Sequence, residues 1–347
     1  MSKRRKVAWL AVPLVVLGSL AVVASVGAKR SATVSQIGYA SPEKPNDYGW
    51  NQQGFVSARR AARTQRATVL AATGIGYENV EPALRRLAQR GADLIIAQAS
   101  GYNTIAPRVA EQFRVPTLVY DNPRATRRPY VADVETRAQE GAYLAGVLAA
   151  RQTRTRTLGI VVSAADTNWF KQSGGFIAGA RSVNKRIRFR YARIGQASYA
   201  DAAGGRRVTQ QVIAAGADIV FGMGDGSSFG MLQAVQTARA PRGARKVYFI
   251  DVIGNKRKVD RRRVLLTSVI WDFTQIFNQA IRDVEANRFG QRGYVLTVRN
   301  GLSLLRTNQA PRIAWSAADR ARRRIVSGRI TIPLTATERS VKRLCRC

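Results

Sequence analysis

The residues best suited to chemistry are three of the five tryptophans and a set of aspartates that follow short apolar runs. They are Trp50, Trp169 and Trp271, with Asp47, Asp121, Asp166, Asp225, Asp251 and Asp272. An indole face stacks on a flat ring, and a carboxylate accepts hydrogen bonds from neighbouring hydroxyl or amino groups. This combination predicts a binding site for a flat solute that carries hydrogen-bond donors.

Each of these residues also has an ordinary structural explanation. A tryptophan can simply fill a core, and an aspartate can begin a turn or cap a helix. We assign Asp166 and Asp272 to turn or capping roles. Three tryptophans at predicted strand ends favour ligand binding for the set as a whole.

Catalytic chemistry is restricted by what the chain lacks. It contains no histidine, which excludes histidine bases, nucleophilic triads and histidine-bound metals. Its two cysteines, Cys345 and Cys347, are too few for a thiolate cluster. We expect no enzyme activity, no catalytic residue, no cofactor and no metal. The Cys-x-Cys pair would be strained if bridged, so we expect a frayed terminus whose thiols are incidental or available for intermolecular pairing.

The N-terminus predicts export. Basic residues 2–6 precede an apolar run at 7–28, which ends in the small residues Val26, Gly27 and Ala28. This pattern is typical of a cleaved signal peptide. Its length is also sufficient for an uncleaved membrane anchor, and that alternative stays open. Either way, we expect the folded part to be extracytoplasmic.

The body of the chain alternates between strand and helix patterns. The strands expected first are 34–39, 67–71, 93–98, 117–120 and 130–132, with helices at 53–65, 78–90 and 105–113. After a helix at 136–150 come strands 158–162, 188–192, 219–222, 247–251 and 264–270, with helices 175–183, 206–215 and 229–238.

A repeated sequence motif, Gly-Ala-Asp followed by an apolar run, divides this part of the chain into two halves. Residues 88–101 and 213–226 each carry a helix end, Gly-Ala-Asp, an apolar run and a loop of small residues. Gly91 is predicted to end its helix, because glycine readily adopts the left-handed conformation. The repeat predicts two α/β lobes of related architecture. In parallel sheets, ligands bind beyond the carboxyl ends of the strands, where the tryptophans and aspartates fall.

Five segments of the chain match short motifs of a known family. The segments are 47–54, similar to D-x-S-F-N-Q…G; 140–146, similar to E-G-x-F-L-A-G; 175–180, similar to G-F-x-A-G; 216–220; and 266–268. Through them the chain resembles the basic membrane proteins, the purine-nucleoside receptors of ABC importers. The segments occur in the family's order over roughly residues 33–300.

The resemblance implies a type I periplasmic-binding-protein fold: two doubly wound α/β lobes joined by three crossovers that close on ligand. We expect four parts: 1–28, a signal or anchor; 31–133 with about 274–292, lobe one; 134–273 with about 293–335, lobe two; and 336–347, a tail. The resemblance carries ligand contacts onto Trp50, Asp47, Asn51, Asp121 and Asp251, with Trp169 as the opposing aromatic. Asp225 and Trp271 complete the expected set.

Two positions depart from the family pattern. Ile253 replaces the second acid of G-V-D-x-D, and Trp271 replaces a lysine. These changes alter the polar contacts, although a ring-bearing, purine nucleoside-like solute remains favoured. We expect a monomeric solute receptor that delivers its ligand to an ABC permease.

Two alternatives remain. One is an extracytoplasmic sensor that reports ligand occupancy to a membrane partner. The other is a polyanion-binding envelope protein, suggested by the formal charge of +36. The arginines are scattered along the chain with no nucleic-acid-binding motif, so specific nucleic-acid binding is not expected.

Overall fold

A computed structural model describes residues 33–347, and the predicted export segment at 1–28 lies outside them. These residues form two six-stranded sheets, each flanked by helices, so the predicted pair of related α/β lobes is confirmed. The chain passes between the sheets three times: after Thr136, after Trp271 and after Leu296.

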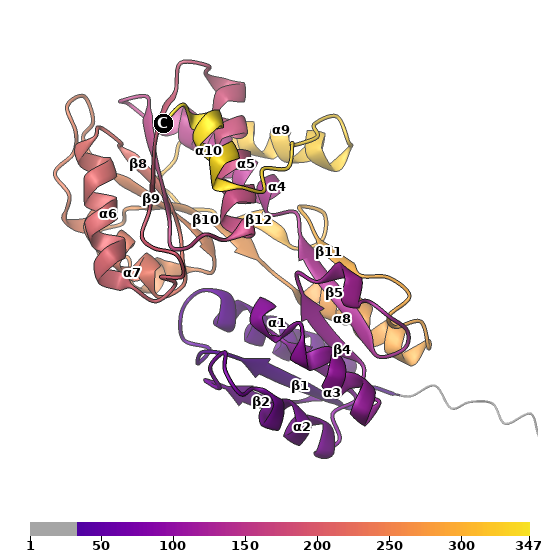
Figure 1. The fold of residues 1–347 in the computed structure, drawn as a ribbon. Helices are drawn as coiled ribbons and strands as arrows, with labels where there is room; N and C mark the ends of the chain where they lie inside the picture. Colours follow the sequence, from indigo (N-terminus) through magenta and orange to yellow (C-terminus); the bar gives the residue numbers. More distant parts are fainter. Residues whose placement is uncertain (1–32) are drawn as a thin grey trace, which may run out of the picture. The chain divides into compact units, whose positions relative to one another are not determined.

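The first sheet is wholly parallel. Its strands, in spatial order, are β11 (Tyr294–Leu296), β5 (Val131–Thr136), β4 (Thr117–Tyr120), β3 (Leu94–Ala97), β1 (Gln36–Ser41) and β2 (Thr68–Thr73). Its helices are α1 (Trp50–Gln65), α2 (Glu81–Gln89), α3 (Ile105–Phe113) and α8 (Thr274–Glu285), with short turns η1 (Ser100–Tyr102) and η2 (Pro123–Ala125). The late segment carrying α8 and β11 returns to this lobe, where α8 packs on α1 and β11 pairs with β5 (Figure 1).

The second sheet repeats this order. Its strands are β12 (Leu302–Leu304), β10 (Leu265–Trp271), β9 (Tyr248–Ile253), β8 (Ile219–Met223), β6 (Thr157–Val162) and β7 (Arg188–Arg193), and only β12 runs antiparallel to its neighbour. Its helices are α4 (Ala138–Gln152), α5 (Thr167–Val183), α6 (Ala202–Ala214), α7 (Ser227–Thr237), α9 (Arg312–Val326) and α10 (Glu338–Cys345), with the turn η3 (Lys256–Lys258).

The repeated Gly-Ala-Asp motif lies at equivalent positions in the two lobes. It joins α2 to β3 in the first lobe and α6 to β8 in the second, and both strands hold the third position from the β2 or β7 edge. Gly91 and Gly216 have φ of 84° and 95°, where a side chain would be strained. The prediction that Gly91 ends its helix is therefore confirmed.

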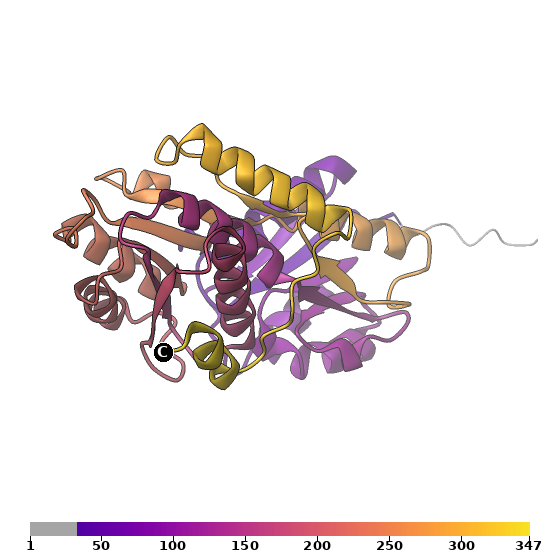
Figure 2. The same cartoon turned by 90° about the horizontal axis from the view of Figure 1, so that it is seen from above.

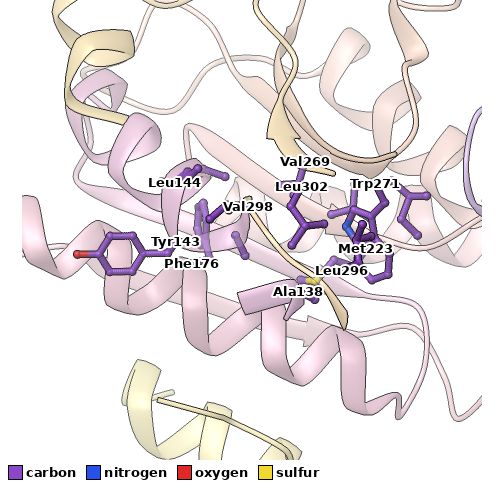
Figure 3. Packing of buried hydrophobic residues seen from close by; sticks show 14 of the residues in the cluster. Ala138, Tyr143, Leu144, Phe176, Met223, Val269, Trp271, Leu296, Val298 and Leu302 are labelled. Carbon is purple, nitrogen blue, oxygen red and sulfur yellow. The ribbon is translucent and has the colours of Figure 1, made fainter. Parts of the chain in front are cut away.

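Hydrophobic burial holds each lobe together. Every residue of β3 and β8 is buried, as expected for parallel strands that helices cover on both faces. The largest apolar cluster joins both sheets to α4 and α5. Figure 3 draws some of its members, including Ala138 and Leu144 from α4, Phe176 from α5, and Val269 and Trp271 from β10.

Glycines allow α4 and α5 to approach at backbone distance. A Cβ on Gly146 would overlap the carbonyl oxygen of Phe176, and a Cβ on Gly179 would overlap that of Tyr143. The glycine-containing segments 140–146 and 175–180 therefore serve helix packing at the start of the second lobe.

The C-terminal end departs from the sequence expectation. Rather than fraying, α10 packs on α5 and β7. Figures 1 and 2 show this yellow C-terminal helix against the second lobe. Cys345 is buried and forms a disulfide with Cys347, which corrects the expectation of incidental thiols. The helix is held by apolar burial of Val341 and by its cap at Thr337.

Several element limits differ from those predicted. α5 begins at Thr167, well before the predicted 175, because Asp166 accepts hydrogen bonds from the amides of its first turn. β5 continues to Thr136, beyond the predicted lobe limit at 133, and β11 lies in the first sheet although 293–335 was assigned to the second lobe. The predicted tail at 336–347 contains α10.

Candidate functional site

One pocket lies where the carboxyl ends of both sheets meet, which is the edge that the sequence predicted. It contains about 630 Å³ of empty space, including its open mouth. We call it the cleft pocket, and it is lined by Trp50, Tyr77, Ala99, Ser100, Gly101, Asp121, Asp166, Asn168, Trp169, Tyr199, Asp225, Ile253 and Trp271. Both lobes contribute to it, so a solute held there would contact both.

Trp50 is fixed at the N-terminus of α1. Its Nε1 donates a 2.8 Å hydrogen bond to the Gln98 carbonyl at the end of β3. Its ring makes edge contacts with Tyr120, Trp271 and Phe273 at centroid distances of 5.1, 6.1 and 5.5 Å. A hydrogen bond and three aromatic neighbours hold this indole before any solute arrives.

Trp169 lies in the first turn of α5, and Asp166 is the N-cap residue that precedes this helix. Asp166 Oδ1 accepts from the amides of Asn168 and Trp169, and its Oδ2 accepts from the Tyr199 hydroxyl at 2.8 Å. Trp169 Nε1 donates to Ser163 Oγ at 3.0 Å. The predicted capping role of Asp166 is confirmed, and the same carboxylate also lines the cleft pocket.

A polar contact joins the lobes across the cleft pocket. Asp121, at the end of β4, accepts from Ser100 Oγ at 2.6 Å and from Asn168 Nδ2 of the other lobe at 3.3 Å. Asp121 adopts φ of 57°, a left-handed conformation that aspartate tolerates better than most residues.

Asp225 and Trp271 each present a buried polar atom without a protein partner. Asp225 is 7% exposed and its Oδ1 accepts no hydrogen bond, while Trp271 is 2% exposed and its Nε1 donates none. Burial, followed by the negative charges of Asp47 and Glu43, raises the pKa of Asp225 well above its usual value, and Lys256 offsets part of this rise. Such atoms are costly in a closed interior unless something binds them.

Three predicted site residues do not line the cleft pocket. Asp47 accepts from the amides of Gly49, Asn51 and Gln52 and from Asn51 Nδ2, which holds the start of α1. Asn51 in turn accepts from the Glu43 amide. These side chains position Trp50, and their predicted direct contact with ligand stays a prediction.

Asp251, the third of them, forms a fully buried ion pair. Its Oδ2 lies 2.8 Å from Lys256 Nζ, and that ammonium also donates to the Tyr48 carbonyl of the other lobe at 3.2 Å. Burial raises the pKa of Asp251 to about 6, against the lowering effect of Lys256. The pair ties the η3 segment to the loop that precedes α1.

Asp272 confirms its predicted turn role. Its Oδ1 accepts from the Thr274 amide at the start of α8 and from Ser57 Oγ, while Oδ2 pairs with Arg60 at 3.0 Å. It links the beginning of α8 to α1 and does not line the cleft pocket.

Five further lining side chains were not predicted as ligand contacts: Tyr77, Ser100, Asn168, Tyr199 and Ile253. Tyr77 and Ser100 follow strands β2 and β3, and Ile253 is the last residue of β9, so the strand-end rule applies to all three. Ile253, which replaces the family acid, is buried at φ of 68°, a strained conformation for a β-branched residue.

Residues 33–347 contain neither a membrane-spanning helix nor a metal-ligating cluster. None of the helices there is both long and apolar enough to cross a membrane. No cluster of three or more His, Cys, Asp or Glu side chains in that range is arranged to hold a metal ion.

The fold and the cleft define a solute-binding protein of the type I periplasmic-binding-protein class. The solute-binding protein of an ABC transporter system from Conexibacter woesei DSM 14684 superposes with a TM-score of 0.72 and 19% identity, covering 87% of this chain and 99% of that one. The predicted fold class is confirmed.

The family follows from the sequence. A family model described as ABC transporter substrate-binding protein PnrA-like matches residues 34–297, and the chain belongs to this family. The resemblance drawn from the five segments is thereby confirmed.

Two relatives match part of the chain. The ABC transporter nucleoside-binding protein BmpA of Lactococcus lactis subsp. cremoris is 26% identical over 56% of this chain and 58% of its own length. The transcriptional activator protein med of Bacillus subtilis is 22% identical over 58% of this chain and 62% of its own. The chain thus spans less than two thirds of each of these relatives.

Proposed function

We propose that this protein is an exported receptor that binds a ring-bearing, nucleoside-like solute in the cleft pocket and presents it to an ABC permease. Ligand contacts made by both lobes would favour the closed arrangement, which the permease then recognises. Binding alone is sufficient for this role, and no step of it requires catalysis. The family to which the chain belongs supports the class of function.

The observation that carries the proposal is the placement of three tryptophans from both lobes around one pocket. Trp50 comes from the first lobe, Trp169 from the second, and Trp271 from the end of β10, where the chain crosses. Indole faces bind planar rings with little loss of conformational freedom. A nucleoside supplies such a ring together with hydroxyls that Asp121 and Ser100 could bind.

Calorimetry and thermal unfolding test the proposal with nucleosides, free bases, sugars and amino acids. A bound solute at about 100 times its Kd stabilises the protein by about 2.7 kcal/mol. Trp50→Ala is expected to weaken nucleoside binding by about 2 kcal/mol or more, because it removes a preorganised stacking face.

Trp315→Phe is the matched control, since Trp315 lies in α9 and does not line the cleft pocket. It should leave the Kd unchanged. If nucleosides neither bind nor stabilise the protein, or if both variants bind them equally well, the proposal is wrong.

A sensor that reports occupancy of the same pocket is a second candidate. The observation favouring it is the similarity to a transcriptional activator, med of Bacillus subtilis. Recovery of a permease complex in a ligand-dependent pull-down would support transport. Recovery of a different membrane protein under the same conditions would support sensing.

A further inference from the structure

The charges around the cleft pocket are opposite in sign to those of the chain as a whole. The chain carries 57 Lys and Arg against 21 Asp and Glu. The lining side chains nevertheless include three carboxylates, from Asp121, Asp166 and Asp225, and no lysine or arginine. In a chain so rich in arginine, a lining with only acidic charges is a specific feature of this site.

Lys256, the cation that influences Asp225, is already paired. The ammonium group of Lys256, which influences Asp225, lies 2.8 Å from Asp251 Oδ2 and also donates to the Tyr48 carbonyl. It is fully buried and does not line the cleft pocket. The pocket carboxylates therefore have no counter-charge among their lining neighbours.

An independent observation points to a ligand that brings this charge. Asp225 is 93% buried, lines the pocket and has an Oδ1 without a hydrogen-bond partner. A buried carboxylate oxygen of this kind is stabilised by a cationic donor far more than by a neutral one.

The aromatic lining suits the same ligand. Trp50, Trp169 and Trp271 all line the pocket. A tryptophan face attracts a cation within about 6 Å of the ring, and desolvation strengthens this attraction.

We propose that the cleft pocket selects ring-bearing solutes that carry a positive charge, with Asp225 as the counter-ion and the indoles as cation–π partners. This inference rests on the proposed function, because it assumes that the cleft pocket is the solute site. It narrows the ligand class from flat solutes in general to protonated or quaternary ring compounds.

Isomeric probes test the charge without changing ligand size. 1-Methyladenosine carries a positive charge at neutral pH, whereas its isomer N6-methyladenosine is neutral. 1-Methylnicotinamide, a cation, and N-methylnicotinamide, which carries the methyl group on its amide and is neutral, form a second pair that lacks ribose. Calorimetry on the full-length protein is expected to show that the cation of at least one pair binds about tenfold more tightly or better, which corresponds to about 1.4 kcal/mol.

Two variants identify the residue responsible. Asp225→Asn keeps the shape of the side chain and should reduce the preference for the cation to less than about threefold. Asp319→Asn removes an exposed carboxylate of α9 outside the pocket and should leave the preference intact. If Asp225→Asn fails to fold, Asp166→Asn, which neutralises a second lining carboxylate, takes its place.

The outcomes separate this inference from the proposed function. If both methyladenosines bind equally and Asp225→Asn changes nothing, the nucleoside receptor stands and charge selection is wrong. If only the nicotinamide cation binds, charge selection stands and the nucleoside assignment fails. If none of the four probes binds, both are overturned.

Discussion

Asp225 is buried and has a carboxylate oxygen, Oδ1, without a hydrogen-bond partner. Its protonation state should therefore depend on what the cleft pocket binds. Burial and neighbouring acids raise its pKa well above the usual value, and burial also raises that of Asp166. The charged or titratable groups that influence Asp225 are Asp47, Glu43, Lys256 and Asp166, with the Tyr77 and Tyr199 hydroxyls beside them. All except Lys256 are acidic groups.

A bound cation should therefore displace a proton. The cation favours the charged carboxylate, so the pKa of Asp225 is lower in the complex than in the free protein. Between these two pKa values binding releases protons, and affinity rises with increasing pH and falls as the pH is lowered. Calorimetry in buffers of different ionisation enthalpy should detect proton release with 1-methyladenosine and much less with N6-methyladenosine. Equal proton release for the two isomers would contradict the role of Asp225.

At the level of single residues, the sequence predicted five of the thirteen pocket-lining positions as ligand contacts: Trp50, Asp121, Trp169, Asp225 and Trp271. The rule that places ligands at strand ends depends only on topology, so it works before any side-chain geometry is known. It could not separate Asp225, whose Oδ1 is open, from Asp47, whose oxygens are used by the α1 amides. That difference arises from local hydrogen bonding in the folded loop.

Among the elements, the α4–α5 contact explains two sequence segments that resemble the family and yet do not line the pocket. Gly146 and Gly179 each face a carbonyl of the opposite helix. Sequence periodicity predicted both helices, but it placed the start of α5 at 175 rather than at Thr167. Backbone contact between the helices compensates for the low helix propensity of their glycines.

Gly179→Ala is accordingly expected to destabilise the protein by about 1–3 kcal/mol, because the added methyl group meets backbone that cannot rotate away. Ser182→Ala, one turn further along α5, changes an exposed side chain with only a local hydrogen bond and should cost less than about 1 kcal/mol. Urea unfolding of the two variants measures the difference. Equal midpoints would show that α4 and α5 can separate without loss.

The C-terminal part of the chain shows why sequence patterns could not predict the complete fold. α8 and β11 belong to the first lobe although more than a hundred residues of the second lobe precede them. Short strands such as β11 and β12 carry too few residues for a periodic signal. Their partners are fixed by how the chain crosses between the lobes, which only the assembled sheets define.

The molecule as a whole is strongly positive, whereas the lining of the cleft pocket is acidic. The salt dependence of binding should therefore distinguish polyanion binding by the surface from solute binding in the pocket. A polyanion held by the surface releases counter-ions, so its affinity falls steeply with salt, by about a thousandfold or more between 50 and 200 mM for six or more phosphate contacts. Contacts in a buried pocket are screened much less. The Kd of a small solute should therefore change by less than about threefold over the same range.

The net charge of the chain opposes the approach of a cationic solute, whereas the acidic side chains of the pocket favour its binding. The charge of +36 repels it at long range, and salt screens this repulsion. Stopped-flow tryptophan fluorescence should show the association rate of 1-methyladenosine rising with salt, while that of N6-methyladenosine stays constant. A fall in the cation's association rate would mean that the acidic pocket governs approach as well as binding. Tight, salt-sensitive binding of heparin without any solute binding would instead favour the polyanion-binding envelope protein over the receptor.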